Sequence, residues 1–370
     1  MEEVSVQKMK TIAVYASAHG YGHASRSHEV ARALVRKDPD VRVHFTSWVP
    51  DSFFAGEAHP RIAGRRRRLD VGMRQIDSLT LDPSGTLEDL DDLADKAEDL
   101  IAEEVDFLLD SRVDVVLCDL PHLVFEAAAR AGIPAWGLSN FSWDWIYEEY
   151  AGDLPGLRRH IQMIRGAYQR ARGLFRLPFS GSMDTFTNIV DIPLVARRSE
   201  VGKTEARRRL GLDPDKSAIL FSFGGFPLNI PAPVGAFRDV VLLCSDPSPD
   251  PGPPFLHLSN RRLKELDLRY CDLVAAADAV LSKLGYGIVS ECVANRTALI
   301  YTPRGRFREY PILAAGVQEY IPATQIMPED LITGGWLKAF DRLKEQTFPA
   351  PIDCHGSEVT AAKLLSELRT

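Results

Sequence analysis

An apolar strand that runs into a glycine turn and then into a helix, within residues 279–320, constrains the fold of this chain most. The run AVLSKL breaks at Gly285-Tyr286-Gly287, and a helical apolar pattern continues from Ile288. The glycines let the backbone turn sharply and approach a bound group, while the free N–H groups at the start of the helix favour an anion. The stretch therefore predicts a strand, a turn that fits a phosphate, and a helix.

Glu291 lies about one helical turn beyond this glycine turn. Its carboxylate could accept hydrogen bonds from ribose hydroxyls while a phosphate occupies the turn. Short Gly-x-Gly turns are common in α/β proteins, however, and a packing turn followed by a solvated glutamate fits the same spacing. The residues alone therefore leave a nucleotide site and a structural turn both open.

The start of the chain carries a matching unit. TIAVYASA (residues 11–18) suits a buried parallel strand, a helical pattern follows from Ser25, and VRVHFTS (residues 41–47) returns as a strand. A strand, helix and strand in this order form a parallel sheet. The turn after the first strand of such a sheet lies at the carboxyl edge, where α/β folds bind ligands.

His19 and His23 flank that turn, which also contains Gly20 and Gly22. Either imidazole can titrate near neutral pH and serve as a general base. The structural alternative is a histidine that caps the helix or bonds to a neighbouring loop. Two histidines around one Gly-x-Gly turn at a sheet edge favour a functional role over the structural one.

Length and composition fit a globular protein with two domains. The chain has 370 residues, of which 45% are hydrophobic and 26% charged. Its net charge of −7 and pI near 5.8 argue against a general nucleic-acid binder. No apolar run is long enough to span a bilayer and the N-terminus lacks an apolar signal core, so we expect a cytoplasmic protein. The five scattered cysteines predict buried thiols rather than disulfides or a metal site.

Two charged features of the N-terminal half allow more than one interpretation. Residues 87–110 predict one long acidic amphipathic helix whose charged face meets water. The four arginines at positions 65–68 are typical of a solvated face. The same cluster could instead receive an anionic acceptor, with Arg74, Gln75 and Asp77 as polar contacts.

The segment SNFSWDWIYEEY (residues 139–150) places aromatic and acidic side chains directly after a predicted strand. Such side chains at the carboxyl edge of a sheet indicate a binding wall, with Trp143, Asp144 and Trp145 as candidate contacts. A buried aromatic patch is the alternative, and it is the commoner use of tryptophan and tyrosine.

A change in composition marks the link between the predicted domains. Residues 181–197 are rich in Ser, Thr, Pro and Asp, and a second series of strands and helices follows them. In that series AILFSFGGF (residues 218–226) is a strand closed by Gly224 and Gly225, and residues 356–370 form a helix that can pack back on the first domain. We therefore predict domains at 1–190 and 191–352, a C-terminal helix within 353–370, and a cleft between the two sheets.

Several of these motifs resemble those of the GT-B glycosyltransferases. They are HGYGHASRS after the first strand, SFGG in the second half, and SKLGYGIVSE followed by PRGRFREYPILAAG. The chain is similar in particular to the lipid-linked N-acetylglucosaminyltransferase of peptidoglycan synthesis and to the glycosyltransferase-like half of plant arabinokinases, the latter over about residues 11–322. The resemblance implies two facing Rossmann-like domains and metal-independent transfer of a sugar, of the hexosyl or N-acetylhexosaminyl type, with UDP as the expected nucleotide.

The resemblance also implies a role for each motif. His23 would take the proton from the acceptor hydroxyl, with His19 as the second choice. Glu291 would bind the ribose. Arg308 and Glu309 would contact the donor sugar, where the family usually has glutamines, so a charged or otherwise unusual sugar is expected. The diphosphate would be held by Gly224, Gly225, Lys283, Gly285, Tyr286 and Gly287, and the acceptor by Gly20, Gly22, Arg74, Gln75, Asp77, Trp143 and Asp144.

Two other functions stay open beside a transferase. One is a nucleotide-sugar hydrolase or epimerase, because the hydrolases of pseudaminic acid synthesis also have a Gly-x-Gly-His turn and use water as acceptor. The other is a non-catalytic sugar-nucleotide sensor or scaffold, because the kinase chemistry of arabinokinases sits in a separate domain. We expect small-molecule substrates, no cofactor beyond the nucleotide sugar and no metal, and we leave a homodimer open.

Overall fold

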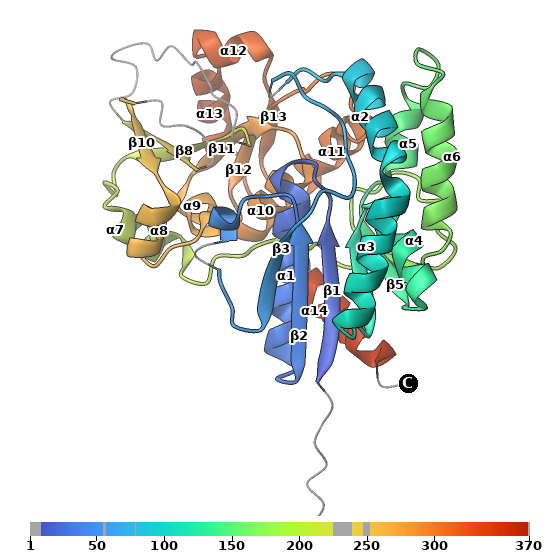
Figure 1. Cartoon of the computed structure of the whole chain (residues 1–370). Coiled ribbons are helices and arrows are strands. Elements are labelled where there is room, and N and C mark those ends of the chain that lie inside the picture. The colour runs from blue at the N-terminus through green and yellow to red at the C-terminus, as the bar shows by residue number, and fades with distance from the viewer. Residues whose placement is uncertain (1–8, 55–56, 78, 225–238, 247–251, 369–370) are drawn as a thin grey trace, which may run out of the picture.

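The computed structural model describes residues 9–54, 57–77, 79–224, 239–246 and 252–368, and it consists of two parallel sheets with helices packed around them (Figure 1). Neighbouring strands run parallel throughout both sheets, which confirms the two predicted parallel-sheet domains. The first sheet contains β1 (Lys10–Ala16), β2 (Val41–Ser47), β3 (Ile62–Arg66), β4 (Val115–Asp119), β5 (Ala135–Ser139), β6 (Gly173–Arg176) and β7 (Ile189–Asp191), in the order β3-β2-β1-β4-β5-β6-β7. The second contains β8 (Ser217–Ser222), β9 (Val240–Ser245), β10 (Phe255–Leu258), β11 (Ala279–Lys283), β12 (Ala298–Thr302) and β13 (Ala323–Gln325), in the order β10-β9-β8-β11-β12-β13.

Strand β1 shows why its sequence forms a central strand. Ile12 and Val14 pack into one hydrophobic cluster, whereas Ala13 and Tyr15 pack into another on the opposite face of the sheet. Successive side chains of a strand point to opposite faces, so an uninterrupted apolar run is needed where helices cover both sides. The carboxyl end of β1 is thereby fixed in the middle of the sheet, next to the ends of β2 and β4.

The helices of the first domain differ from the prediction at two places. Residues 87–110 form two helices rather than one, because Lys96 adopts φ −103° and ψ −1° and interrupts the run. Both helices keep apolar residues inward, so the sequence pattern conceals the break. The helices are α1 (Gly20–Lys37), the short 3-10 helix η1 (Asp51–Phe54), α2 (Pro83–Asp95), α3 (Ala97–Asp110), α4 (His122–Ala131), α5 (Trp143–Glu148) and α6 (Leu157–Tyr168).

Helix α1 begins at Gly20 rather than near Ser25, which is the second difference. The Gly-x-Gly segment therefore forms the first turn of the helix. Gly20 takes φ +69°, a conformation that glycine adopts without strain. As a result His23 lies within the helix, close to the end where backbone N–H groups have no partner inside the helix.

In the second domain the predicted strand, glycine turn and helix are confirmed, because β11 leads through Gly285 into α10 (Tyr286–Asn295). The last helix, α14 (Gly356–Glu367), packs against α1 of the first domain, where Arg36 and Glu358 lie 3.8 Å apart (Figure 1). The other helices of this half are α7 (Gly202–Leu210), α8 (Asn260–Glu265), α9 (Tyr270–Ala276), α11 (Tyr310–Gly316), η2 (Val317–Glu319), α12 (Pro328–Thr333) and α13 (Trp336–Lys344).

Two expectations from composition concern membranes and thiols. Within the described ranges, no helix has the length and apolar character needed to cross a bilayer. All five cysteines are free, and four of them are buried.

Candidate active site

A cleft of about 710 Å³ opens where the carboxyl ends of the two sheets face each other. Each domain contributes its glycine turn and the residues at the ends of neighbouring strands. The lining includes His19, His23 and Arg26 from the first domain and Ser222, Lys283 and Glu291 from the second. A site shared by two domains at the ends of parallel strands is a common location for a ligand.

The two glycine turns are in backbone contact across this cleft. A Cβ atom on Gly287 would lie 3.0 Å from the Cα atom of Gly22, closer than side chains normally approach. A side chain at position 287 would therefore require the backbone at Gly22 of the other domain to shift. The consequence is that the N-termini of α1 and α10 meet at one place, and both can direct backbone N–H groups toward an anion.

His23 is positioned by a buried carboxylate that sequence reasoning did not find. Asp119 is the last residue of β4 and lies in register with Ala16 at the end of β1. The Nδ1 atom of His23 is 2.8 Å from Oδ1 of Asp119 and 3.0 Å from Nη2 of Arg26. When Nδ1–H donates to this carboxylate, the lone pair of the imidazole is on Nε2, as a general base requires. The available signal was an aspartate near the end of the apolar run VDVVLCDL (residues 113–120).

Arg26 balances the charge of Asp119. Its Nε atom donates to Oδ2 at 2.6 Å and its Nη2 atom to Oδ1 at 2.7 Å, in a bidentate pair that is buried on both sides. Burial raises the pKa of Asp119, but the charges of Arg26 and His23 outweigh this effect and lower it to about 2. The carboxylate is thus ionised near neutral pH, and its orientation is fixed by Arg26 and by the Ser27 hydroxyl, which donates to Oδ2 at 3.0 Å.

His19 differs from His23 in its hydrogen bonding. The backbone N–H of Met73 donates to Nδ1 of His19 at 3.3 Å, so the neutral ring carries its proton on Nε2. Burial and the nearby charge of Arg304 hold the pKa of His19 well below its usual value. Its ring is stacked on Phe307 with the centroids 6.0 Å apart. In this arrangement the neutral ring of His19 can donate a hydrogen bond from Nε2.

Glu291, the predicted ribose ligand, lines the cleft and is paired with an arginine from the segment between β7 and α7. Arg197 donates from Nε to Oε1 of Glu291 at 2.6 Å. The same guanidinium lies 3.7 Å from Glu57 of the first domain. Burial raises the pKa of Glu291, and Arg197 offsets part of that rise. One arginine therefore connects the first domain, the interdomain segment and the second domain.

Two cations stand at the end of the second sheet. Lys283 is the last residue of β11, and Arg304 follows the neighbouring strand β12. Burial and the charge of Arg304 lower the pKa of Lys283 to about 7, and burial also lowers the pKa of Arg304. Nη1 of Arg304 lies 3.8 Å from the position of a Cβ atom on Gly285, at the start of α10. Two cationic side chains therefore lie beside the second glycine turn, one of which, Arg304, is paired with Glu309 at 2.8 Å.

Several contacts join the domains around these cations. Lys283 donates from Nζ to Oε1 of Gln75 at 3.1 Å, so the predicted acceptor residue Gln75 meets the predicted donor side. Glu309 accepts from Nη2 of Arg304 at 2.8 Å and from Nδ2 of Asn140 at 2.6 Å, and it is buried. Glu309 thus lies in the cleft, but as the partner of an arginine.

Other predicted site residues are occupied elsewhere. Arg308 donates from Nη1 to the backbone oxygen of Trp145 at 2.7 Å and pairs with Glu148 at 2.9 Å, so it turns toward helix α5. Trp143 is buried and donates from its indole nitrogen to Asp70 at 3.1 Å, as expected of the aromatic-core alternative. Asp144 accepts from Arg165 at 3.1 Å.

The remaining positions complete the comparison with the sequence. Arg74 is half-exposed and pairs with Asp82, Glu88 and Asp89. Asp77 accepts hydrogen bonds from the backbone of the next residues, where it closes a turn. Gly224 takes φ +71° and lines the cleft with Gly20 and Tyr286, whereas Gly225 lies outside the described residues. Across the described ranges, no group of three or more His, Cys, Asp and Glu side chains is placed to hold a metal ion.

The architecture and this cleft define the class of the fold, which is the GT-B fold of glycosyltransferases. Solved structures with this arrangement match almost the whole chain. The Arabidopsis thaliana protein UGT89C1, solved with UDP-L-rhamnose, is 13% identical with a TM-score of 0.58, covering 98% of this chain and 100% of that one. A UDP-glucosyltransferase from Polygonum tinctorium is 15% identical with a TM-score of 0.59, covering 98% and 99%. The predicted fold is confirmed.

One relative is similar in sequence as well. An L-arabinokinase of Arabidopsis thaliana is 33% identical over 342 residues, which cover 90% of this chain and 32% of that protein. The chain therefore spans about a third of this relative's length, and the predicted resemblance to arabinokinases is confirmed over that part. No family model matches the chain.

Proposed function

We propose that this protein is a glycosyltransferase that moves a sugar from a nucleoside-diphosphate sugar, with UDP as the nucleotide, to a hydroxyl group of a small-molecule acceptor. One observation carries the proposal. His23, oriented by Asp119 at 2.8 Å, opens into the same cleft as the cation-lined turn before α10. A base and a site for a leaving diphosphate are thus brought together, and glycosyl transfer needs both.

The proposed reaction uses the two domains in different ways. His23 accepts the proton of the acceptor hydroxyl on Nε2, and the acceptor oxygen forms a bond to the anomeric carbon. The bond from that carbon to the diphosphate oxygen breaks, and its electron pair stays on the leaving nucleoside diphosphate. The N-terminus of α10, Lys283 and Arg304 stabilise this negative charge, so the proposed reaction uses no metal ion.

The nucleoside would be held by Glu291. In this proposal its Oε2 atom accepts from ribose hydroxyls, while Oε1 stays with Arg197. Structures of the same fold in complex with UDP and with UDP-L-rhamnose support the choice of nucleotide. The predicted contacts of Arg308 with the donor sugar are not part of this proposal, because Arg308 is paired with Glu148.

The first experiment is a thermal-shift panel of UDP, GDP, ADP, CDP and TDP. A ligand that binds only the folded state raises the melting temperature, by an amount equivalent to about 2.7 kcal/mol at a hundredfold excess over Kd. We expect a selective shift with UDP. A panel without any shift would contradict the nucleotide site, and a selective shift with another nucleotide would replace UDP.

A second experiment tests turnover. UDP release from UDP-glucose and UDP-L-rhamnose should depend on an added hydroxyl acceptor and should be lost in His23→Ala. Release that is equally fast without an acceptor, and that also needs His23, would identify a hydrolase instead.

A non-catalytic nucleotide-sugar module is the second candidate function. It is favoured by the similarity of this chain to about a third of an L-arabinokinase, a protein named for a sugar kinase activity. Tight UDP binding without turnover of any donor, in a protein whose melting curve shows one cooperative transition, would support it over the transferase.

A further inference from the structure

The four consecutive arginines at positions 65–68 are not equivalent in the folded protein. Arg65 donates to both oxygens of the buried Glu104, at 2.6 and 2.7 Å. Arg67 pairs with Glu103 and Arg68 with Asp89, the latter at 3.5 Å. Among the described residues, Arg66 alone of the four has no carboxylate partner. Three arginines of the cluster are therefore neutralised by the protein, and one is not.

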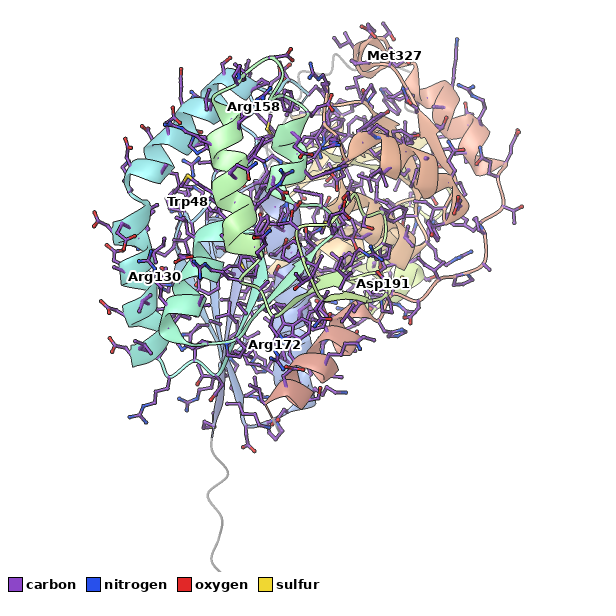
Figure 2. The ribbon with its side chains drawn as sticks, turned by 90° about the vertical axis from the view of Figure 1, so that its right-hand side faces the viewer. Trp48, Arg130, Arg158, Arg172, Asp191 and Met327 are labelled. Carbon is purple, nitrogen blue, oxygen red and sulfur yellow. The ribbon has the colours of Figure 1, made fainter. Side chains whose placement is uncertain are left out.

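Arg66 is also the member of the cluster that reaches the cleft. Its guanidinium lies over the ring of Trp48, 4.5 Å from the centroid, and its Nε atom donates to the Trp48 backbone oxygen at 3.4 Å. Both residues line the cleft, and Trp48 is 43% exposed. By contrast Arg130, which pairs with Glu98 and Glu126, lies at the outer edge of the first domain (Figure 2).

The sheet order explains this position. Trp48 directly follows β2, and Arg66 is the last residue of β3, in register with Ser47. Their strand ends lie at the same carboxyl edge as the end of β1, which leads to His23. Neighbouring strands are roughly 4.8 Å apart, so β3 and β1 are separated by roughly 10 Å. A ligand that reaches Arg66 can thus extend across the edge to His23.

The first-domain lining of the cleft also includes a group of apolar and aromatic side chains. Tyr21 and Phe53 are stacked with their centroids 4.8 Å apart, and Val49, Pro50 and Met73 also line the cleft. Apolar and aromatic walls hold flat or apolar ligand bodies, whereas a single cation sets their orientation. An arginine fork also matches the two oxygens of a carboxylate.

We propose that Trp48 and Arg66 form the outer end of the acceptor site, and that the acceptor is an apolar hydroxyl compound with a carboxylate at its far end. The carboxylate binds Arg66, the apolar body lies along Trp48 and Phe53, and the hydroxyl reaches His23. This inference rests on the proposed transferase function, because it assigns the acceptor to that same cleft.

The test measures binding without a donor, so it does not depend on turnover. The probe is 4'-hydroxybiphenyl-4-carboxylate, a rigid apolar body with a hydroxyl at one end and a carboxylate at the other, and its methyl ester is the neutral match. Titration calorimetry gives both dissociation constants. We expect the acid to bind about fivefold more tightly than the ester. This ratio corresponds to the upper end of the free energies that solvent-accessible ion pairs contribute. High salt should reduce this preference.

Two matched variants locate the effect. Arg66→Gln should abolish the preference for the acid, whereas Arg68→Gln, in the same cluster but paired with Asp89, should keep it. Bound acid should also protect Trp48 from acrylamide quenching, a signal that Trp48→Phe removes. Equal affinity of acid and ester in the unaltered protein, absence of binding by the acid, or equal effects of the two arginine variants would overturn the inference.

A UDP thermal shift on the same samples separates this inference from the proposed function. If UDP binds and the acid is not preferred, the acceptor assignment is wrong and the donor site stands. If the Arg66-dependent preference is found without any nucleotide binding, the anion site stands and the transferase proposal fails.

Discussion

The turn between β1 and α1 and the turn between β11 and α10 are built alike, yet their surroundings differ in charge. Each follows a buried central strand and leads, at the same cleft, into a helix that begins at or directly after the first glycine of a Gly-x-Gly segment. Around the first turn, the charge of Asp119 is already balanced by Arg26. Around the second, Arg304 is paired with Glu309, and Lys283 stands beside a helix N-terminus whose dipole is also positive.

The difference comes from the strands that lie next to each turn. Asp119 ends β4, the neighbour of β1, while Arg304 follows β12, the neighbour of β11. In both domains the strand, turn and helix place backbone N–H groups at the edge of the sheet. The charged side chains come from the ends of the adjacent strands. We therefore expect the first turn to act on protons and the second to bind the anion and nucleoside.

The largest expected effect is that of His23→Ala, which should lower kcat about 10²- to 10⁴-fold and leave UDP affinity unchanged. A proton is transferred only in the transition state, whereas UDP binds at the other turn. Kinetics of UDP release and calorimetry with UDP measure the two quantities. His19→Ala is the matched control, with a smaller loss of kcat, because its Nδ1 is bonded to Met73. Weaker UDP binding in His23→Ala would break the proposed division between the turns.

The next effect concerns the second turn. Glu291→Ala should weaken UDP binding about tenfold, by loss of hydrogen bonds from the ribose to a charged acceptor, and should change kcat less. These hydrogen bonds exist in both the ground state and the transition state, so they contribute mainly to binding. A melting curve must accompany the measurement, since in the described part of the chain the variant leaves the buried Arg197 with Glu57 as its one remaining carboxylate partner, at 3.7 Å. A variant that binds UDP normally but has lost kcat would reverse the assignment.

The sequence predicted the two turns because a strand, a glycine pair and a helix are local patterns. It also placed His23 and Glu291 after strands whose ends face the cleft. It did not predict Asp119, which is 96 residues from His23, or Arg197, which is 94 residues from Glu291. Asp119 and Arg197 meet their partners because of the strand order and the path of the interdomain segment. Neither can be predicted from a local sequence pattern. The break at Lys96 was not predicted because apolar residues face inward in both helices, so the sequence pattern does not show where one ends.

A smaller effect is expected when the partner of Glu291 is removed. In Arg197→Gln nothing offsets the burial that raises the pKa of Glu291, so this carboxylate should take up a proton as the pH falls. UDP affinity should then be about fivefold weaker at pH 6 than at pH 8.5, a larger dependence on Glu291 than in the unaltered protein, where Arg197 offsets part of the rise in its pKa. Calorimetry at both pH values measures it. Arg197→Lys keeps a positive charge and should restore most of the affinity at pH 6, whereas a loss that is equal at both pH values would indicate a purely structural role.

The smallest predicted effect is a pH dependence that originates from Lys283. Its pKa of about 7 means that the ammonium group loses its proton as the pH rises through neutrality. A diphosphate binds the charged form, so UDP affinity should fall about threefold between pH 6.5 and pH 8, a modest value because Arg304 and the helix N-terminus keep their charge. In Lys283→Arg the side chain stays protonated over this range, and the decline should disappear. If UDP affinity falls equally in this variant, the titrating group belongs elsewhere, and the cationic character of the second turn rests on Arg304 and the start of α10.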